Sequence, residues 1–208
     1  NPQEAKLIIT QNPGGDREEV NTLYEWGRKD ALPNTTKIYP ANAFKAINGR
    51  ASVGKTIQTP GTYYYTSSAQ NDPYATTYAN TWSTNNTKMP NRSDDEVTKT
   101  IYDPCPAGFH MPASNAFTGF TTTGESESSD KSKYNVVGPW DYGWHFKTHT
   151  TPIETIFFPA TGFLFYYDGR LAYTGEHGHG HYWSAFPADV QNGLFLDFNE
   201  NQKKEDLD

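Results

Sequence analysis

The feature that most limits the fold of this 208-residue chain is its excess of aromatic over branched aliphatic side chains. Phe, Trp and Tyr number 31, whereas Ile, Leu and Val together number only 22. Aromatic rings must therefore build much of any core. Charged residues make up 20% of the chain, below the roughly 25% of an average domain, and apolar side chains occur along its whole length. We expect a folded, aromatic-rich module rather than a disordered chain.

The charge pattern argues against nucleic-acid binding, and the length of the apolar runs argues against a transmembrane segment. The formal net charge is −7, and the longest basic run, Lys203–Lys204, lies beside acidic residues. Nucleic-acid binding requires clustered Lys and Arg that displace counterions from phosphates. The longest apolar runs, 156–158 and 163–167, fall far short of the roughly 20 residues that cross a bilayer. We therefore expect no nucleic-acid partner and no transmembrane segment in this chain.

The single cysteine limits disulfides and metal sites, and the first residues bear on whether a targeting segment has been removed. Cys105 is the only cysteine, so this chain has no internal disulfide, and a Cys-based zinc cage is disfavoured. The chain begins at Asn1 without a charged and then apolar signal segment. We expect either that a targeting peptide has been removed or that the chain is a piece of a longer protein.

Two short helices are predicted. Asp16 can cap a helix over 17–26, and a second helix is expected after Pro112, with Ser114 or its neighbour as cap. The apolar residues that share one face are Val20, Leu23 and Tyr24 in the first helix and Phe117 and Phe120 in the second. Between them, 33–96 has no clear periodicity, and 61–92, rich in Tyr, Ser, Thr and Asn, is predicted to be a long loop region.

Six short runs with the composition of β-strands follow in the second half of the chain. They span 144–146, 155–158, 163–167, 170–173, 182–184 and 194–198. Asp168–Gly169, between the third and fourth runs, predicts a hairpin turn. Early helices followed by antiparallel strands predict an α+β domain.

Five motifs carry a resemblance to a known family. They are Glu25–Asp30 (EWGRKD), Asp103–Pro112 (DPCPAGFHMP), Phe158–Gly162 (FPATG), Gly180–Ala185 (GHYWSA) and Leu194–Phe198 (LFLDF). In this order they resemble the motifs of the major paralogous domain, which is abundant in surface lipoproteins and fimbrillin-associated proteins of Bacteroidota and Fibrobacter. The resemblance implies a C-type lectin-like α+β fold, with two helices, a small twisted antiparallel sheet and long loops that form the ligand face.

The resemblance also implies a division of the chain. Residues 16–208 are expected to form a single C-type lectin-like domain. From the residues themselves, the β-prone run Leu7–Thr10 and the breaker sequence Asn-Pro-Gly-Gly at 12–15 predict that 1–15 is a linker or an incoming strand. Family members commonly end in a strand whose cysteine is expected to pair with the one in the DPCP motif. This chain lacks that strand, so either the chain is truncated or this member has lost it, and Cys105 is left as a free thiol.

Aromatic side chains of the long loop region are candidates for ligand binding. They are Tyr63, Tyr64, Tyr65, Tyr74, Tyr78 and Trp82. Their flat faces can stack on a sugar without a metal ion. The alternative is that the rings pack against the scaffold, as we also expect for Trp82 and Trp183. A calcium-dependent sugar site is disfavoured, because the Glu-Pro-Asn, Gln-Pro-Asp and Trp-Asn-Asp triplets of calcium-dependent lectins do not occur.

The segment 176–181, Glu-His-Gly-His-Gly-His, is the sharpest local group of potential metal ligands. In an extended segment His177, His179 and His181 would project on one side, and three imidazoles suit Zn²⁺, Ni²⁺ or Cu²⁺. The glycines favour instead a turn that scatters the rings, which would make this a Gly- and His-rich surface loop. We expect no dedicated cofactor, and Zn²⁺ or Ni²⁺ bound here would be adventitious.

No catalytic residue is predicted. Cys105 and His110 lie close in sequence, but the prolines on each side of Cys105 and the structural role that the resemblance implies argue against a nucleophile and base. The chain has no Gly-x-Ser-x-Gly elbow, phosphate loop or His-Glu-x-x-His helix. Its acidic groups at 94–96 and 125–127 lie in polar surroundings, which does not favour a catalytic carboxylate pair.

These observations together predict a non-enzymatic module on the cell surface, at the extracellular face of the outer membrane. It would belong to a lipoprotein or a fimbria-associated protein and recognise a host or microbial glycan or surface protein through its long loops. The alternative is a structural fimbrial subunit, at the tip or accessory, that contacts only neighbouring subunits. The run Leu7–Thr10 and the missing last strand would then mark where another chain pairs by strand addition.

Overall fold

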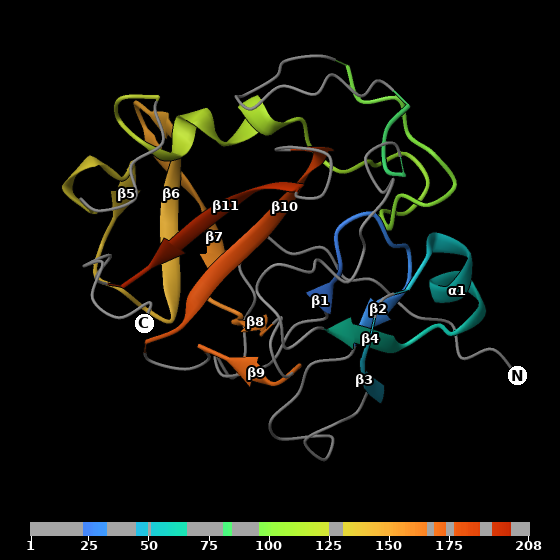
Figure 1. Cartoon of the computed structure of the whole chain (residues 1–208). Helices are drawn as coiled ribbons and strands as arrows, with labels where there is room; N and C mark the ends of the chain where they lie inside the picture. The colour runs from blue at the N-terminus through green and yellow to red at the C-terminus, as the bar shows by residue number, and fades with distance from the viewer. Residues whose placement is uncertain are drawn as a thin grey trace, which may run out of the picture.

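The computed structural model describes most of the second half of the chain and shorter stretches of the first half (Figure 1). The described residues are 23–32, 45–49, 51–65, 81–84, 96–124, 131–165, 169–173, 177–187 and 193–200. They form eleven β-strands, one short α-helix and two 3-10 helices. No helix within these ranges is long and apolar enough to span a membrane.

The described strands pair in five small sheets. In the first half, β1 (Leu23–Tyr24) pairs antiparallel with β2 (Ala31–Leu32), and β3 (Lys45–Asn48) pairs in parallel with β4 (Thr62–Tyr65) through the crossover helix α1 (Val53–Gln58). Then follow the 3-10 helices η1 (Ser114–Phe120) and η2 (Lys131–Lys133). An antiparallel sheet comprises β5 (Val136–Val137), β6 (Gly143–Thr150) and β7 (Ile153–Pro159). Two antiparallel pairs complete the chain, β8 (Phe163–Leu164) with β9 (Leu171–Ala172) and β10 (His179–Pro187) with β11 (Gly193–Asn199).

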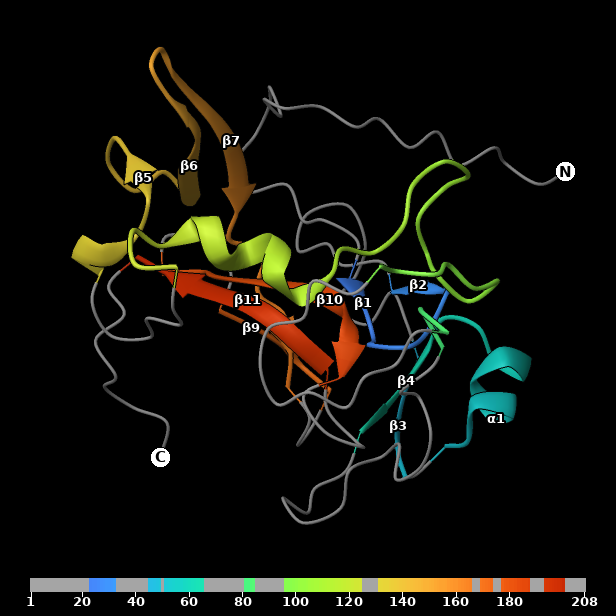
Figure 2. The ribbon, with the colours of Figure 1, turned by 90° about the horizontal axis from the view of Figure 1, so that it is seen from above.

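The β10–β11 pair lies at the centre of this arrangement. In Figures 1 and 2 the sheet β5–β6–β7 lies on one side of it, and β3, β4 and α1 lie on the other. Helix η1 contacts β6, β10 and β11. Figure 2 shows the β6–β7 hairpin extending away from the body of the molecule.

The C-type lectin-like α+β fold expected from the resemblance is wrong. Strands predominate in the described residues, and the helices are short, with six residues in α1 and seven in η1. Several small, mostly antiparallel sheets take the place of one twisted sheet flanked by two helices. The architecture is therefore closer to all-β.

The helix predicted over 17–26 is wrong in its described part, and 17–22 lies outside the described residues. Leu23 and Tyr24 form β1 and pair with β2. The chain reverses between the two strands at Gly27, whose φ of 83° is readily adopted only by glycine. The backbone of Leu23 and Tyr24 pairs with β2 instead of forming helical hydrogen bonds. This pairing overrides the helical spacing of the apolar residues.

The second predicted helix is present, but as a 3-10 helix. Its N-cap is Ala113, which makes no side-chain capping hydrogen bond, so Ser114 does not cap it. Phe117 and Phe120 pack edge to face with ring centroids 5.6 Å apart, as the apolar pair in the sequence suggested. The pair therefore predicts the packing of this helix better than its hydrogen bonding.

The sequence patterns did not predict α1, which lies in the segment expected to be loops and short strands. The helix contains Gly54 and the β-branched residues Thr56 and Ile57, which lowers its intrinsic helix propensity. Ser52 caps it, since its side-chain oxygen accepts a hydrogen bond of 3.2 Å from the backbone N–H of Lys55.

The predicted strands of the second half are confirmed where they are described. The runs 144–146, 155–158, 182–184 and 194–198 lie within β6, β7, β10 and β11. The predicted hairpin between β8 and β9 is also present. The backbone N–H of Gly169 donates to Phe165 O at 2.8 Å, and its φ of 70° requires a residue tolerant of the left-handed region. Asp168 lies outside the described residues.

Aromatic rings build the core, as the composition predicted. One cluster consists of buried Tyr134, Trp144, Phe146, Ala160 and Phe198, and a second consists of Trp26, Trp82, Val97, Ala185 and Phe186. Many of the rings meet edge to face, an arrangement that adds to the gain from area burial. Strand β10 contributes to both clusters and so ties them together.

The motifs behind the resemblance make contact with one another. The indole N–H of Trp26 donates to Ser184 O at 3.1 Å, and that of Trp183 donates to Tyr24 O at 2.9 Å. These reciprocal bonds join the turn of β1 and β2 to β10. The backbone N–H of Ala185 donates to Pro112 O at 2.8 Å, which attaches the end of the DPCP motif to the same strand. In this structure the motifs form the scaffold.

The fully buried carboxylate of Asp103 organises the loop 103–111. It accepts hydrogen bonds from Lys99 Nζ at 2.9 Å, Cys105 N at 2.7 Å and Met111 N at 2.8 Å. The ammonium of Lys99 also donates to two carbonyl groups of this loop. The loop is therefore wrapped around a hydrogen-bonded ion pair, the arrangement that a buried charge needs.

Candidate functional site

The two faces of the β10–β11 pair differ in character because side chains alternate along each strand. The inner face, which packs into the Phe198 cluster, comprises Gly180, Tyr182, Leu196 and Phe198. The outer face comprises His179, His181, Trp183, Phe195, Asp197 and Asn199. Its histidines, its carboxylate and its exposed ring make it the richest group of functional side chains in the described part of the chain.

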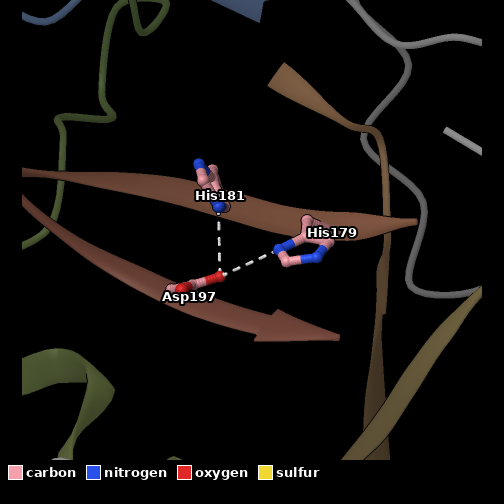
Figure 3. Close-up of side chains that lie close together, drawn as sticks. All are labelled: His179, His181 and Asp197. Atoms are coloured by element: carbon pink, nitrogen blue, oxygen red, sulfur yellow. Dashed lines mark ion pairs between the residues drawn. The ribbon is translucent and has the colours of Figure 1, made fainter. Parts of the chain in front are cut away.

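His179, His181 and Asp197 converge on the outer face. Figure 3 shows two imidazoles from β10 pointing toward one carboxylate from β11. Asp197 Oδ1 lies 3.1 Å from His181 Nε2 and 3.7 Å from His179 Nδ1. One donor atom from each of the three residues lies within 4.8 Å of the others. The cross-strand pairing of His181 with Asp197 produces this convergence.

Two further observations concern the hydrogen bonding of the ring nitrogens of His181 and His179. His181 Nε2 is buried and makes no hydrogen bond of regular geometry, although the Asp197 carboxylate lies beside it. The Asn199 side-chain amide lies 3.3 Å from His179 Nε2, the nitrogen opposite the one that faces Asp197. Asn199 is therefore placed to set which nitrogen of His179 carries the proton.

The pKa of Asp197 is held well below its usual range. Burial on its own would raise this pKa, but the ring nitrogens of His179 and His181, which approach the carboxylate at 3.7 and 3.1 Å, outweigh burial and lower it. The carboxylate therefore stays ionised at neutral pH and presents an anionic oxygen between two imidazoles.

Three aromatic rings contact the two imidazoles of this group. Phe163 stacks on His181 with centroids 4.3 Å apart and an interplanar angle of 5°. The ring centroids of Tyr173 and His179 are 4.6 Å apart, and those of Phe195 and His181 are 5.0 Å apart. We call Phe163, Tyr173, His179, His181, Phe195 and Asp197 the histidine–aromatic layer.

Backbone hydrogen bonds attach the residues next to β8 and β9 to the start of β10. Gly162 N donates to His179 O, and His179 N donates to Tyr173 O, at 2.8 and 2.9 Å. Tyr173 has a φ of 55°, in the left-handed region that a bulky residue rarely adopts. Tyr142, which precedes β6, has the same φ. Non-glycine residues in this region persist where the surrounding structure holds them.

His177, predicted as a third ligand beside His179 and His181, lies apart from them. It precedes β10, its side chain is 78% exposed, and its Nδ1 lies 3.1 Å from a Glu200 carboxylate oxygen. The extended alternative of the prediction therefore holds for His179 and His181, and the ligand that replaces His177 in the cluster is Asp197.

The aromatic candidates of the long loop region are mostly buried where they are described. Tyr63, Tyr64 and Trp82 are 7%, 3% and 1% exposed, and Trp82 packs at an angle against Trp26. This is the core-packing alternative. Tyr65 is partly exposed, and Tyr74 and Tyr78 lie outside the described residues.

Cys105 and His110 do not form a catalytic pair in this structure. Burial and the neighbouring Asp103 carboxylate raise the pKa of the Cys105 thiol to about 11, so the thiolate is scarce at neutral pH. The Nδ1 atom of His110 lies 2.9 Å from the carbonyl of the next residue.

The sequence reasoning missed Asp197, Tyr173 and Phe195. Asp197 interrupts the apolar run of the LFLDF motif, and a charged residue within such a run was a usable signal. No pattern within one strand identifies the residue across the pair, because that depends on register. Comparisons with family models, with curated proteins and with solved structures found no match to this chain.

Proposed function

We propose that this chain is a non-enzymatic, cell-surface adhesion module that binds a glycan on the histidine–aromatic layer. The observation that carries the proposal is that two partly exposed rings flank a polar group. Tyr173 is 36% and Phe195 is 44% exposed, and the imidazoles and the carboxylate of Asp197 lie between them.

A sugar ring offers both kinds of contact that this layer provides. Its C–H faces are apolar and stack on aromatic rings, while its hydroxyl groups donate to carboxylates and exchange hydrogen bonds with imidazoles. Among the described residues many aromatic rings are buried in the core, so partly exposed rings on either side of a polar group indicate an interaction surface. The guanidinium of Arg170, 5.0 Å from the ring of Phe165, adds a hydrogen-bond donor close to this surface.

Two observations support a binding role without catalysis at the cell surface. The raised pKa of Cys105 leaves the thiol un-ionised, and the hydrogen bonds of the DPCP loop give its residues a structural role. The five motifs resemble those of bacterial surface lipoproteins and fimbrillin-associated proteins, which favours an extracellular location for the layer.

A glycan array probed with the purified chain tests this function, followed by titration of the glycans that bind. We expect Tyr173→Gly and Phe195→Ala each to weaken binding by about 2 kcal/mol or more, as truncation of an aromatic hot-spot residue does. Glycine is chosen at Tyr173 because it accepts the φ of 55° and so keeps the backbone intact. Phe109→Ala is the matched control, since this ring is 55% exposed but lies outside the layer.

The outcome depends on which variants lose binding. Loss in the two layer variants, with the Phe109 variant unchanged, supports the proposal. Binding that survives in Tyr173→Gly and Phe195→Ala would place the glycan elsewhere, and an array without any binding would remove the glycan from the proposed function.

A further inference from the structure

We propose that His179, His181 and Asp197 bind one divalent transition-metal ion, with Zn²⁺ as the expected ion. This inference goes beyond glycan binding and does not depend on it, because the three side chains are sufficient to test it with the metal alone. It also replaces the three-histidine set of the sequence prediction, since His177 lies apart from the cluster.

The distances are close to those of a bound ion. In a tetrahedral zinc site with bonds of about 2.0–2.1 Å, donor atoms lie about 3.3 Å apart. Asp197 Oδ1 is 3.1 Å from His181 Nε2 and 3.7 Å from His179 Nδ1, on either side of that value. All three donor atoms fall within 4.8 Å of one another, so small side-chain rotations bring them around one ion.

The types of donor select the class of ion. Two imidazole nitrogens and one carboxylate oxygen suit Zn²⁺ and other late first-row ions, whereas Ca²⁺ and Mg²⁺ require sets made of oxygen. Three protein ligands leave a fourth position for water or for an oxygen of a ligand, as in open zinc sites. The side chain of Asp197 is 47% exposed, so the carboxylate edge of this group faces solvent.

The surroundings of the histidines favour metal binding. His181 Nε2 is buried, and its polar neighbour, Asp197 Oδ1 at 3.1 Å, does not meet it with regular hydrogen-bond geometry, so a metal bond to this nitrogen would give it a well-oriented partner. A metal bound to His179 Nδ1 places the proton on Nε2, which lies 3.3 Å from the Asn199 amide. Rotating that amide by half a turn presents its oxygen to the proton, which is the usual outer-shell support for a histidine ligand.

The rings of the layer complete the site. Phe163 stacks on His181 and Tyr173 contacts His179, so both imidazoles are restricted before an ion arrives. Restricting the ligands in advance lowers the conformational entropy that binding costs. An ion at this point lies between the two partly exposed rings, where it is able to coordinate the ligand that they hold.

Isothermal titration of the metal-free chain, purified without a polyhistidine tag, with Zn²⁺ tests the inference. We expect the titration to give one ion per chain. In a separate thermal unfolding experiment, we expect Tm to rise by about 5–10 °C at a free-ion concentration about 100 times Kd. Co²⁺ is the second probe, because its visible absorption reports four-coordinate geometry. Asp197→Ala and His179→Gln should each weaken binding by at least about tenfold, since loss of an outer-shell partner alone typically costs about 10–100-fold.

His177→Gln is the matched control, because it removes an exposed imidazole two residues from the site and should leave the affinity unchanged. Circular dichroism of each variant verifies that it is folded. The inference is overturned if Zn²⁺ does not bind the wild-type chain, if Asp197→Ala keeps its affinity, or if His177→Gln loses as much as His179→Gln. Metal binding without glycan binding leaves this inference standing and removes only the proposed function, and the reverse result removes only the metal site.

Discussion

The two faces of the β10–β11 pair have opposite compositions although they belong to the same two strands. On the inner face the ring of Phe198 is completely buried over Gly180, and the Tyr182 hydroxyl donates to Pro159 O at 2.6 Å. On the outer face His181 Nε2 lacks a regular hydrogen bond, and the Phe195 ring is 44% exposed. The comparison indicates that the inner residues hold the fold, whereas the outer face leaves Phe195 and Asp197 exposed.

The alternation of side chains along each strand and the register of the pair produce this division. Because side chains alternate, every outer residue is positioned by the packing of its inner neighbours. A register shift of one residue would turn His179 and His181 toward the core and Phe198 toward solvent. The packing of the inner face prevents this shift. The rigidity of the inner face therefore fixes the geometry of the outer one.

The largest expected effect comes from comparing one phenylalanine on each face. Phe198→Ala should lower the free energy of unfolding by about 3–5 kcal/mol, because it opens a cavity in the aromatic cluster. Phe195→Ala should lower it by about 1 kcal/mol or less, because its ring is partly in solvent. Urea unfolding measures both. Equal losses would contradict the division between the faces.

A smaller effect is expected from adding one methyl group to the inner face. The Cβ of Gly180→Ala would overlap the Phe198 ring, which is buried and has no room to move, so we expect a loss of about 1–3 kcal/mol in unfolding free energy. Gly119→Ala is the control, because a Cβ at that position meets nothing within 4 Å. If the Gly180 variant were as stable as the Gly119 variant, the tight packing of the inner face would be disproved.

The smallest effect concerns the one polar group of the inner face. Tyr182→Phe removes the hydrogen bond to Pro159 O and should cost about 1 kcal/mol near pH 8. Burial raises the pKa of the Tyr182 phenol, so its stabilising contribution is complete below the unfolded pKa of about 10 and is lost as the pH rises further.

Thermal unfolding at pH 8 and at pH 11 measures this difference. The gap in stability between the wild type and Tyr182→Phe should narrow at the higher pH, because only the wild type has this phenol to ionise in the unfolded state. A gap that stayed constant or widened between the two pH values would show that Tyr182 is not held un-ionised by the inner face.

The sequence predicted the strands of the second half better than the elements of the first. Alternation and turn residues are local signals, and they located the runs that became β6, β7, β10 and β11. The helix over 17–26 failed because the spacing of three apolar residues says nothing of the partner strand that Leu23 and Tyr24 find in β2. Helix α1 was missed because its central residues Gly54, Thr56 and Ile57 are weak helix formers, and the structure shows that Ser52 caps it.

The candidate site was predicted in part for the same reason. The period-two spacing of His179 and His181 is local, and it correctly anticipates that both rings project on one side of a strand. The third member, Asp197, comes from the neighbouring strand, and its place depends on the register of the pair. For the loop aromatics the sequence left ligand binding and packing against the scaffold as alternatives, and the burial of Tyr63, Tyr64 and Trp82 agrees with packing.

The most direct test of the binding role of the outer face is an NMR titration that follows the imidazole rings of the chain while a glycan that binds on the array, or Zn²⁺, is added. We predict that the signals of His179 and His181 move on binding and that those of His110, His145 and His149, which lie outside the histidine–aromatic layer, do not. Saturable binding that moved the signals of the second group and left His179 and His181 unchanged would contradict the account.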